Sequence, residues 1–205
     1  MNMRRVVLFI IIILQITFFT EGYGIFSPID TSEMSDTLHA TLLRQHAIKT
    51  IPPGNYSGIT YLGNDDYAVV SDKGSQEGFF TFHITLTENG EIKRVDNKVF
   101  TPLPGANLDE EAVAYNPTTH HLYIGNEAPS EIIDYDMERK KVVNSTIIED
   151  YRQRSKVNRS IESLTYDHKR NRLFTINESP LTGDNGLLLR LKQLTTDLKE
   201  EKKFS

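Results

Sequence analysis

Short apolar runs alternate with clusters of turn residues along most of the chain, which is the pattern of β-strands. The runs are four to six residues long, rich in Val, Ile, Leu, Tyr and Phe, and are bounded by Gly, Asn, Asp, Pro and Ser. The pattern predicts an all-β fold. A helix is predicted only at residues 31–49, where Leu38, Leu42 and Leu43 share one face.

The β pattern repeats three times. SGITY, EAVAY and ESLTY align without gaps, and so do YAVVSD, LYIGNE and LFTINE further along each copy. The copies start at Ser57, Glu111 and Glu162, which lie 54 and 51 residues apart. Each copy closes on an acid 15 or 16 residues after its start, at Asp72, Glu127 and Glu178. A repeat of this length indicates one supersecondary unit used several times.

Each copy predicts an antiparallel meander. Residues 63–66, 116–120 and 167–171 have the composition of hairpin turns that join the first two strands. A third strand is expected in each copy, and a fourth in two of them. The expected third strands are 78–85, 131–136 and 187–191, and the expected fourth strands are 92–100 and 141–148.

A unit of four antiparallel strands in about 50 residues is typical of a β-propeller blade. We therefore expect a partial β-propeller over residues 51–205, with blades at about 55–100, 107–148 and 158–205, after a lead-in segment at 25–50. A two-sheet sandwich would explain the strands but not the acids at fixed offsets.

Propellers close with about four to eight blades, and this chain supplies three, the last one cut short. A fragment, a truncated reading frame or a half that pairs with a second chain are the alternatives. A chain truncated at Ser205 is expected to be inactive.

The N-terminus predicts export. Residues 1–24 combine a basic start with a fourteen-residue apolar stretch and small residues near Gly22 and Gly24, as in a signal peptide; an uncleaved anchor is the alternative. The chain contains no cysteine, so neither a disulfide nor a lipidated cysteine is expected. We expect a secreted or cell-envelope protein. Its net charge of −5 argues against nucleic-acid binding, and nothing beyond the leader is expected to insert in a membrane.

The repeated acids are the candidate site. Equivalent positions of successive blades converge on the propeller axis, so Ser57, Glu111 and Glu162 would form one ring and the three closing acids another. Clustered carboxylates repel one another, which raises their pKa values or recruits a hard cation. Oxygen ligands without cysteine suit Ca²⁺ better than Zn²⁺. Capping of turns by single acids is the alternative.

Three motif pairs resemble the phytase-like family, described as having esterase-like activity of phytase. These are GNYSGITY with YAVVSDKG, LDEEAVAYNP with LYIGNEAPSEIIDYD, and NRSIESLTYD with LFTINESPLTGDNG. The resemblance spans about residues 54–191, but members of the family continue for further blades. Ser57 stands where the other two copies have glutamate, which the family allows.

The resemblance implies a secreted propeller that hydrolyses phosphate esters or phosphodiesters with a divalent cation, expected to be Ca²⁺. Glu111 and Glu162 are the expected catalytic residues. The expected metal ligands are Asp72, Asp109, Glu127 and Glu178. The expected partners are a small phosphorylated or ester substrate and either a second chain or further C-terminal blades that close the ring.

Whether the chain is an enzyme stays open at this point. A non-catalytic envelope propeller with a structural cation, and a lactone or carboxylic-ester hydrolase on the same fold, are the alternatives.

Overall fold

The computed structural model describes residue 43 and residues 48–105, 109–157 and 159–204. The predicted leader at 1–24 lies outside these residues. The predicted helix at 31–49 also lies outside them, apart from Leu43, Ile48 and Lys49. None of the helical structure in the described part of the chain is long and apolar enough to cross a membrane.

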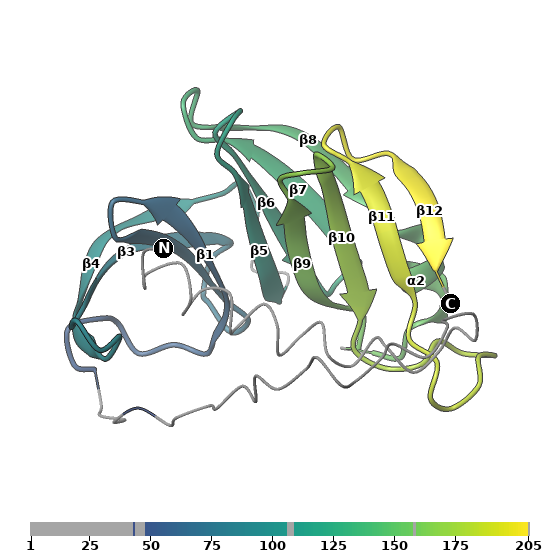
Figure 1. The fold of residues 1–205 in the computed structure, drawn as a ribbon. Helices are drawn as coiled ribbons and strands as arrows, with labels where there is room; N and C mark the ends of the chain where they lie inside the picture. The colour runs from purple at the N-terminus through teal and green to yellow at the C-terminus, as the bar shows by residue number, and fades with distance from the viewer. Residues whose placement is uncertain (1–42, 44–47, 106–108, 158, 205) are drawn as a thin grey trace, which may run out of the picture. The chain divides into compact units, whose positions relative to one another are not determined.

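Within the described residues, twelve strands form three antiparallel sheets of four, each in chain order, as a propeller blade requires (Figure 1). Blade 1 contains β1 (Tyr56–Gly63), β2 (Asp66–Ser71), β3 (Gly78–Leu86) and β4 (Ile92–Pro102). Blade 2 contains β5 (Glu110–Asn116), β6 (His121–Asn126), β7 (Glu131–Asp136) and β8 (Lys141–Ile147). Blade 3 contains β9 (Ile161–Asp167), β10 (Arg172–Asn177), β11 (Leu191–Thr195) and β12 (Glu200–Phe204).

The chain divides into two compact units, and both ends of the β3–β4 connection belong to the smaller one. That unit comprises residues 1–47 and 86–93. Its described part is a tight turn, in which the Thr87 N–H donates to the Glu91 carbonyl at 2.8 Å and the Gly90 N–H donates to the Thr87 carbonyl at 3.0 Å. The larger unit, residues 48–85 and 94–205, carries the core and the candidate site.

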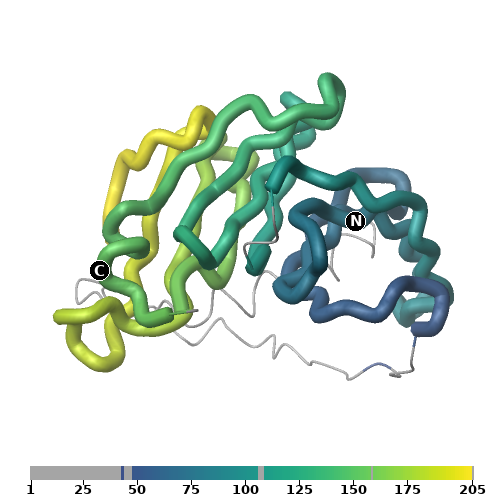
Figure 2. Tube along the Cα trace, turned by 180° about the vertical axis from the view of Figure 1, so that it is seen from behind, coloured from purple at the N-terminus to yellow at the C-terminus, as the bar shows by residue number. Residues whose placement is uncertain are grey.

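The first strands of the three blades are neighbours, because β5 contacts both β1 and β9 (Figures 1 and 2). Glycine allows this close approach at two places. A Cβ on Gly58 would lie 2.9 Å from Val70 Cγ2 and 3.1 Å from the Ala112 Cα, and a Cβ on Gly125 would lie 2.9 Å from Ile161 Cγ2. The first strand of each blade is therefore the innermost.

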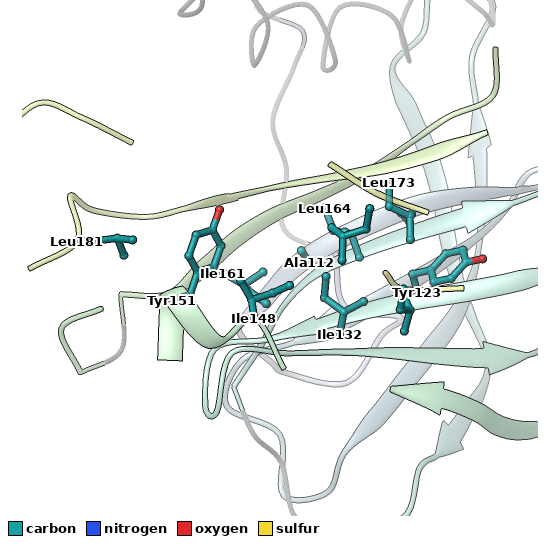
Figure 3. Close-up of a cluster of buried hydrophobic side chains, with 12 residues drawn as sticks. Ala112, Tyr123, Ile132, Ile148, Tyr151, Ile161, Leu164, Leu173 and Leu181 are labelled. Atoms are coloured by element: carbon teal, nitrogen blue, oxygen red, sulfur yellow. The ribbon is translucent and has the colours of Figure 1, made fainter. Parts of the chain in front are cut away.

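Strands β5, β6 and β7 of blade 2 are largely buried on both faces, to which alternate residues of each strand point. One face packs on Ala68, Val70 and Phe79 of blade 1. The other face forms a cluster with blade 3, shown in Figure 3, whose labelled members are Ala112, Tyr123, Ile132, Ile148, Tyr151, Ile161, Leu164, Leu173 and Leu181. A sheet covered by a sheet on each side excludes the two-sheet sandwich.

The hairpin turns explain why the strands stop where they do. Asn64 and Asp65 both have positive φ, at 52° and 62°, as a two-residue turn with the twist of a hairpin requires. In blade 3 the Asp167 carboxylate accepts the backbone N–H groups of Lys169 and Arg170, at 2.8 and 3.1 Å, and Asn171 has a φ of 53°.

The third strand of blade 3 was predicted wrongly. Residues 187–190 are loop, with Leu187 94% exposed, and the strand is β11. The apolar run suggested a strand, but the Arg190 guanidinium is held by Asp184 at 2.8 Å, and the backbone N–H of Arg190 donates to Asn177 Oδ1 at 2.7 Å. Blade 3 is also not cut short in strands, because β12 completes its sheet.

Helix α2 (Glu149–Arg154) links blades 2 and 3 and was not predicted. It is too short for an apolar stripe, and only Tyr151 is buried in it. Acidic residues in its first turn and basic residues in its last turn suit the helix dipole. The side chain of Lys192, fully buried, pairs with Asp150 at 3.3 Å and lies 5.1 Å over the Tyr151 ring. These contacts tie the helix to β11.

Candidate functional site

A β-bulge lies at the start of the inner strand in all three blades. The pairing skips from Tyr56 to Gly58 in β1, from Glu110 to Ala112 in β5 and from Ile161 to Ser163 in β9. The skipped residues are the first residues of the repeats, Ser57, Glu111 and Glu162. Bulges re-aim a side chain out of the sheet pattern and are frequent beside active sites. The repeat therefore encodes the same local distortion three times.

The closing acids occupy matching places beside the bulges. The backbone N–H groups of Asp72, Glu127 and Glu178 donate to the carbonyls of Asn55, Asp109 and Ser160, at 3.1, 2.9 and 2.8 Å. Each bond joins the end of a second strand to the start of the inner strand of its own blade. All three closing acids therefore lie at the same end of the sheets as the bulges, opposite the hairpin turns.

We call the six acids at this end of the sheets the acid mouth: Asp72, Asp109, Glu111, Glu127, Glu162 and Glu178. Glu111 is its electrostatic centre. Burial raises the pKa of Glu111 to about 7, with further contributions from the charges of Asp72, Glu162 and Glu127. Those charges come from all three blades, so acids of each blade lie within electrostatic range of Glu111. The positive charge of Lys73 acts in the opposite direction.

The pKa values of Glu127 and Glu162 are also raised. Burial raises the pKa of Glu127, as do Glu178 and Asp109, while a hydrogen bond from the Ser160 N–H at 2.9 Å lowers it. Loss of hydration around the carboxyl group raises the pKa of Glu162, and the charges of Glu178 and Glu127 add to this effect. Glu162 as a residue is exposed, whereas Glu127 is buried at 8% exposure. Glu162 can therefore be reached from solvent.

Two basic side chains at the acid mouth were missed by the sequence analysis. Lys73 Nζ lies 3.3 Å from Asp109 Oδ1 and 3.4 Å from Asp72 Oδ2. Arg159 Nη1 lies 2.7 Å from Glu178 Oε1. Both residues lie beside the aligned motifs. A basic residue next to the repeated acids was the sequence signal that could have identified them.

A second layer of buried polar groups was also missed. Glu110 Oε1 accepts the Gly78 N–H at 2.9 Å, and Glu77 Oε1 accepts the Asn126 side-chain amide at 2.7 Å. Burial raises the pKa of Glu77, assisted by the charge of Glu131. These bonds cross from blade 1 to blade 2, so they position the strand that carries the Glu111 bulge.

The donor chemistry of the acid mouth suits a hard cation, but the spacing of the side chains does not yet form a chelate. All its donors are carboxylate oxygens, which Ca²⁺ prefers, and Asp72 Oδ1 is buried without a hydrogen-bond partner. Across residues 48–105, 109–157 and 159–204, no three His, Asp or Glu side chains lie near enough together to hold one ion. Binding an ion would therefore require these side chains to turn toward one another.

Comparison with known proteins identifies one sequence family. The family described as "Phytase-like: Esterase-like activity of phytase" matches residues 51–204. A search of curated proteins found no match.

Solved structures similar to this chain include propellers of unrelated sequence. A Lactobacillus plantarum protein has 13% identity and a TM-score of 0.47, covering 82% of this chain and 48% of that one. Kuenenia stuttgartiensis hydrazine synthase has 10% identity and a TM-score of 0.45, covering 80% and 39%. The Cps50 (Swd1) β-propeller domain of Myceliophteria thermophila has 11% identity and a TM-score of 0.44, covering 76% and 40%. The chain thus spans less than half the length of each.

Proposed function

We propose, from the premise that this chain belongs to the phytase-like family of β-propellers, that its acid mouth hydrolyses phosphate esters. The observation that carries the proposal is Glu111, a bulge residue whose pKa of about 7 results from burial and from three neighbouring carboxylates. A carboxyl group that titrates near neutral pH is suited to general acid–base catalysis, and an ordinary solvated glutamate is not.

Glu111 and Glu162 divide the proton transfers in this proposal. Glu111 accepts a proton from the water that attacks phosphorus, as the new P–O bond forms. Glu162, whose pKa is also raised, gives a proton to the ester oxygen as its bond to phosphorus breaks. Exchange with solvent then returns both groups to their starting states. The charges of Glu111 and Glu162 interact, so the pKa values belong to the pair, and the division of roles between them is part of the proposal.

A divalent cation is part of the proposal. Asp72, Asp109, Glu127 and Glu178 are the residues that would hold it, and we propose Ca²⁺ because all their donors are oxygen. When bound, such an ion would supply Lewis-acid stabilisation of phosphoryl oxygens. Glu127 would bind through its second oxygen, since Oε1 accepts the Ser160 N–H.

We also propose that the protein acts outside the cytoplasm, because residues 1–24 have the pattern of a leader. N-terminal sequencing of protein recovered outside the cell checks this. A sequence that starts near Gly22 or Gly24 supports cleavage, and recovery only in the cell interior contradicts export.

One observation favours a second candidate, a non-catalytic binding propeller. Much of the negative charge of the acid mouth is already compensated without any ligand, by Lys73, Arg159 and the Ser160 N–H. A lactone or carboxylic-ester hydrolase on the same fold is a third candidate function. The substrates described below distinguish it from a phosphate-ester hydrolase.

Activity assays on the full-length gene product decide between these functions. The substrates are 4-nitrophenyl phosphate, bis(4-nitrophenyl) phosphate and 4-nitrophenyl acetate, each with Ca²⁺ and with EDTA. We expect Ca²⁺-dependent turnover of a phosphorylated substrate, and a loss of about 10²–10⁴-fold in kcat for Glu111→Gln. The control is Glu138→Gln, a glutamate with a 72% exposed side chain outside the acid mouth.

Turnover that is unchanged by EDTA contradicts the role of the cation. Turnover that persists in the double variant Glu111→Gln and Glu162→Gln contradicts the two catalytic roles. Hydrolysis of the acetate alone supports the carboxylic-ester alternative. No turnover of any substrate supports the binding propeller.

A further inference from the structure

We propose that Lys73 is the residue that binds the phosphate group of the substrate, exchanging its carboxylate partners for the phosphoryl oxygens. This inference rests on the proposed function and adds a positioning residue to it. Lys73 directly follows Asp72 after the end of β2, and Nζ bridges Asp72 Oδ2 at 3.4 Å and Asp109 Oδ1 at 3.3 Å. It therefore joins the end of a blade 1 strand to the start of blade 2.

A phosphate ester needs a cation to approach this surface. The six acids of the acid mouth repel a phosphate dianion, because like charges at short range interact unfavourably. Among the residues that the structure describes, Lys73 and Arg159 are the basic side chains in contact with these acids. An anion would be drawn to one of these two groups.

Lys73 is the better placed of the two for catalysis at Glu111. Its Nζ lies 3.3 Å from Asp109 Oδ1, and Asp109 is two residues before Glu111 along the chain. Its positive charge also acts on Glu111. The charge of Arg159 acts instead on Glu162, and its guanidinium holds Glu178 at 2.7 Å. A phosphate on Lys73 would consequently be presented to the side of the mouth where Glu111 lies.

The contacts of Lys73 are easily exchanged. Its side chain is 53% exposed, and its two ion pairs exceed 3.2 Å, so neither has the short geometry of a strong charge-assisted hydrogen bond. Exposed ion pairs of this kind contribute little to stability. A phosphate dianion with several acceptor oxygens competes well with two carboxylates at that strength. The ion pairs hold the ammonium group in place before substrate arrives.

The exchange has a second consequence. When phosphate neutralises Lys73, Asp72 and Asp109 lose a shared partner, and Asp72 already has a buried oxygen without a hydrogen bond. In the proposed function, the carboxylates of Asp72 and Asp109 would then be able to turn from Lys73 toward the cation.

The test compares Lys73→Gln and Lys73→Arg with the wild-type full chain. Lys199→Gln is the matched control, because Lys199 is an exposed lysine paired with Asp197 at 2.6 Å. Calorimetry measures the binding of inorganic phosphate, and kinetics measures KM for 4-nitrophenyl phosphate and for the neutral acetate ester. Thermal unfolding shows whether each variant is folded.

We expect Lys73→Gln to weaken phosphate binding by about 10–100-fold, as loss of a hydrogen bond to a charged group predicts. KM for the phosphate ester should rise by a similar factor, and KM for the acetate should not. Arginine should restore most of the affinity, because it keeps the positive charge.

The outcomes separate this inference from the proposed function. If no phosphate ester is turned over but phosphate binds wild type and not Lys73→Gln, the hydrolytic function fails and the role of Lys73 stands. Equal phosphate affinity in wild type and Lys73→Gln, or no binding to wild type, overturns the role of Lys73. If Lys73→Gln does not fold, loss of phosphate affinity in folded Lys73→Arg would also overturn it.

Discussion

Single residues at the acid mouth owe their chemistry to neighbours in other blades. Glu111 and Glu138 are both glutamates of blade 2, yet Glu138 has a 72% exposed side chain, whereas Glu111 is partly buried beside three carboxylates. The raised pKa of Glu111 is also a statement about stability, because the folded chain then binds its proton more tightly than the unfolded chain.

Stability should consequently fall with pH through the titration of Glu111. Its carboxyl titrates near 4.5 when unfolded and near 7 when folded, so the free energy of unfolding decreases as pH rises between these values. Glu111→Gln should leave stability unchanged at pH 4.5 and raise it by about 1–2 kcal/mol at pH 8, after allowance for solvent screening. Urea unfolding at the two pH values measures this difference.

Glu138→Gln is the control and should change stability by the same small amount at both pH values. A Glu111→Gln effect that is equal at pH 4.5 and pH 8 would show that the folded-state pKa of Glu111 is not raised.

At the level of elements, the bulge and the close approach of inner strands act together. Gly58 follows the Ser57 bulge, and a Cβ there would lie 3.1 Å from the carbonyl oxygen of Glu111 and 2.9 Å from Val70 Cγ2. The backbone that presents Glu111 therefore packs directly on the neighbouring blade. Space at Gly58 is needed to hold the strand that carries Glu111 in place.

Gly58→Ala should destabilise the fold by about 1–3 kcal/mol, because the added methyl overpacks the seam between β1 and β5. It should also lower activity, since the Glu111 backbone must shift. Gly186→Ala is the control, because nothing lies within 4 Å of the position that its added methyl would take, and it should be neutral. Urea unfolding and the phosphate-ester assay measure both effects; a neutral Gly58→Ala would mean that the strands separate without cost.

At the level of the larger compact unit, apolar seams join the three blades. Blade 2 contributes side chains to clusters on both of its faces, and Tyr151 of α2 extends the seam with blade 3 (Figure 3). Cores shared between neighbouring repeats make their folding cooperative. The acid mouth, which draws residues from all three blades, depends on both seams.

Leu173→Ala in the seam between blades 2 and 3 should cost about 2–5 kcal/mol, because Leu173 is fully buried. Val143→Ala, at a residue that is 39% exposed, should cost less than about 0.5 kcal/mol. Circular dichroism and tyrosine fluorescence should report one coincident transition in each variant. Two separate transitions would contradict cooperative unfolding of the blades.

The sequence by itself determined the repeated strand order and the acids at matching offsets, since alternating apolar runs and turn residues act locally. It predicted β7 at residues 131–136 without error. It failed at residues 187–191, where ion pairs made by Arg190 outweigh the apolar pattern, and at α2, which is stabilised by burial of Tyr151 rather than by periodicity.

Only the tertiary structure decided how the repeated acids are placed and how they interact with one another. Alignment showed that Ser57, Glu111 and Glu162 are equivalent, but pairing across each sheet revealed that all three are bulges. The pKa of Glu111 and the position of Lys73 depend on burial and on charges from other blades. These are long-range quantities, because Coulomb energy and hydration depend on distance in space and not on separation along the chain.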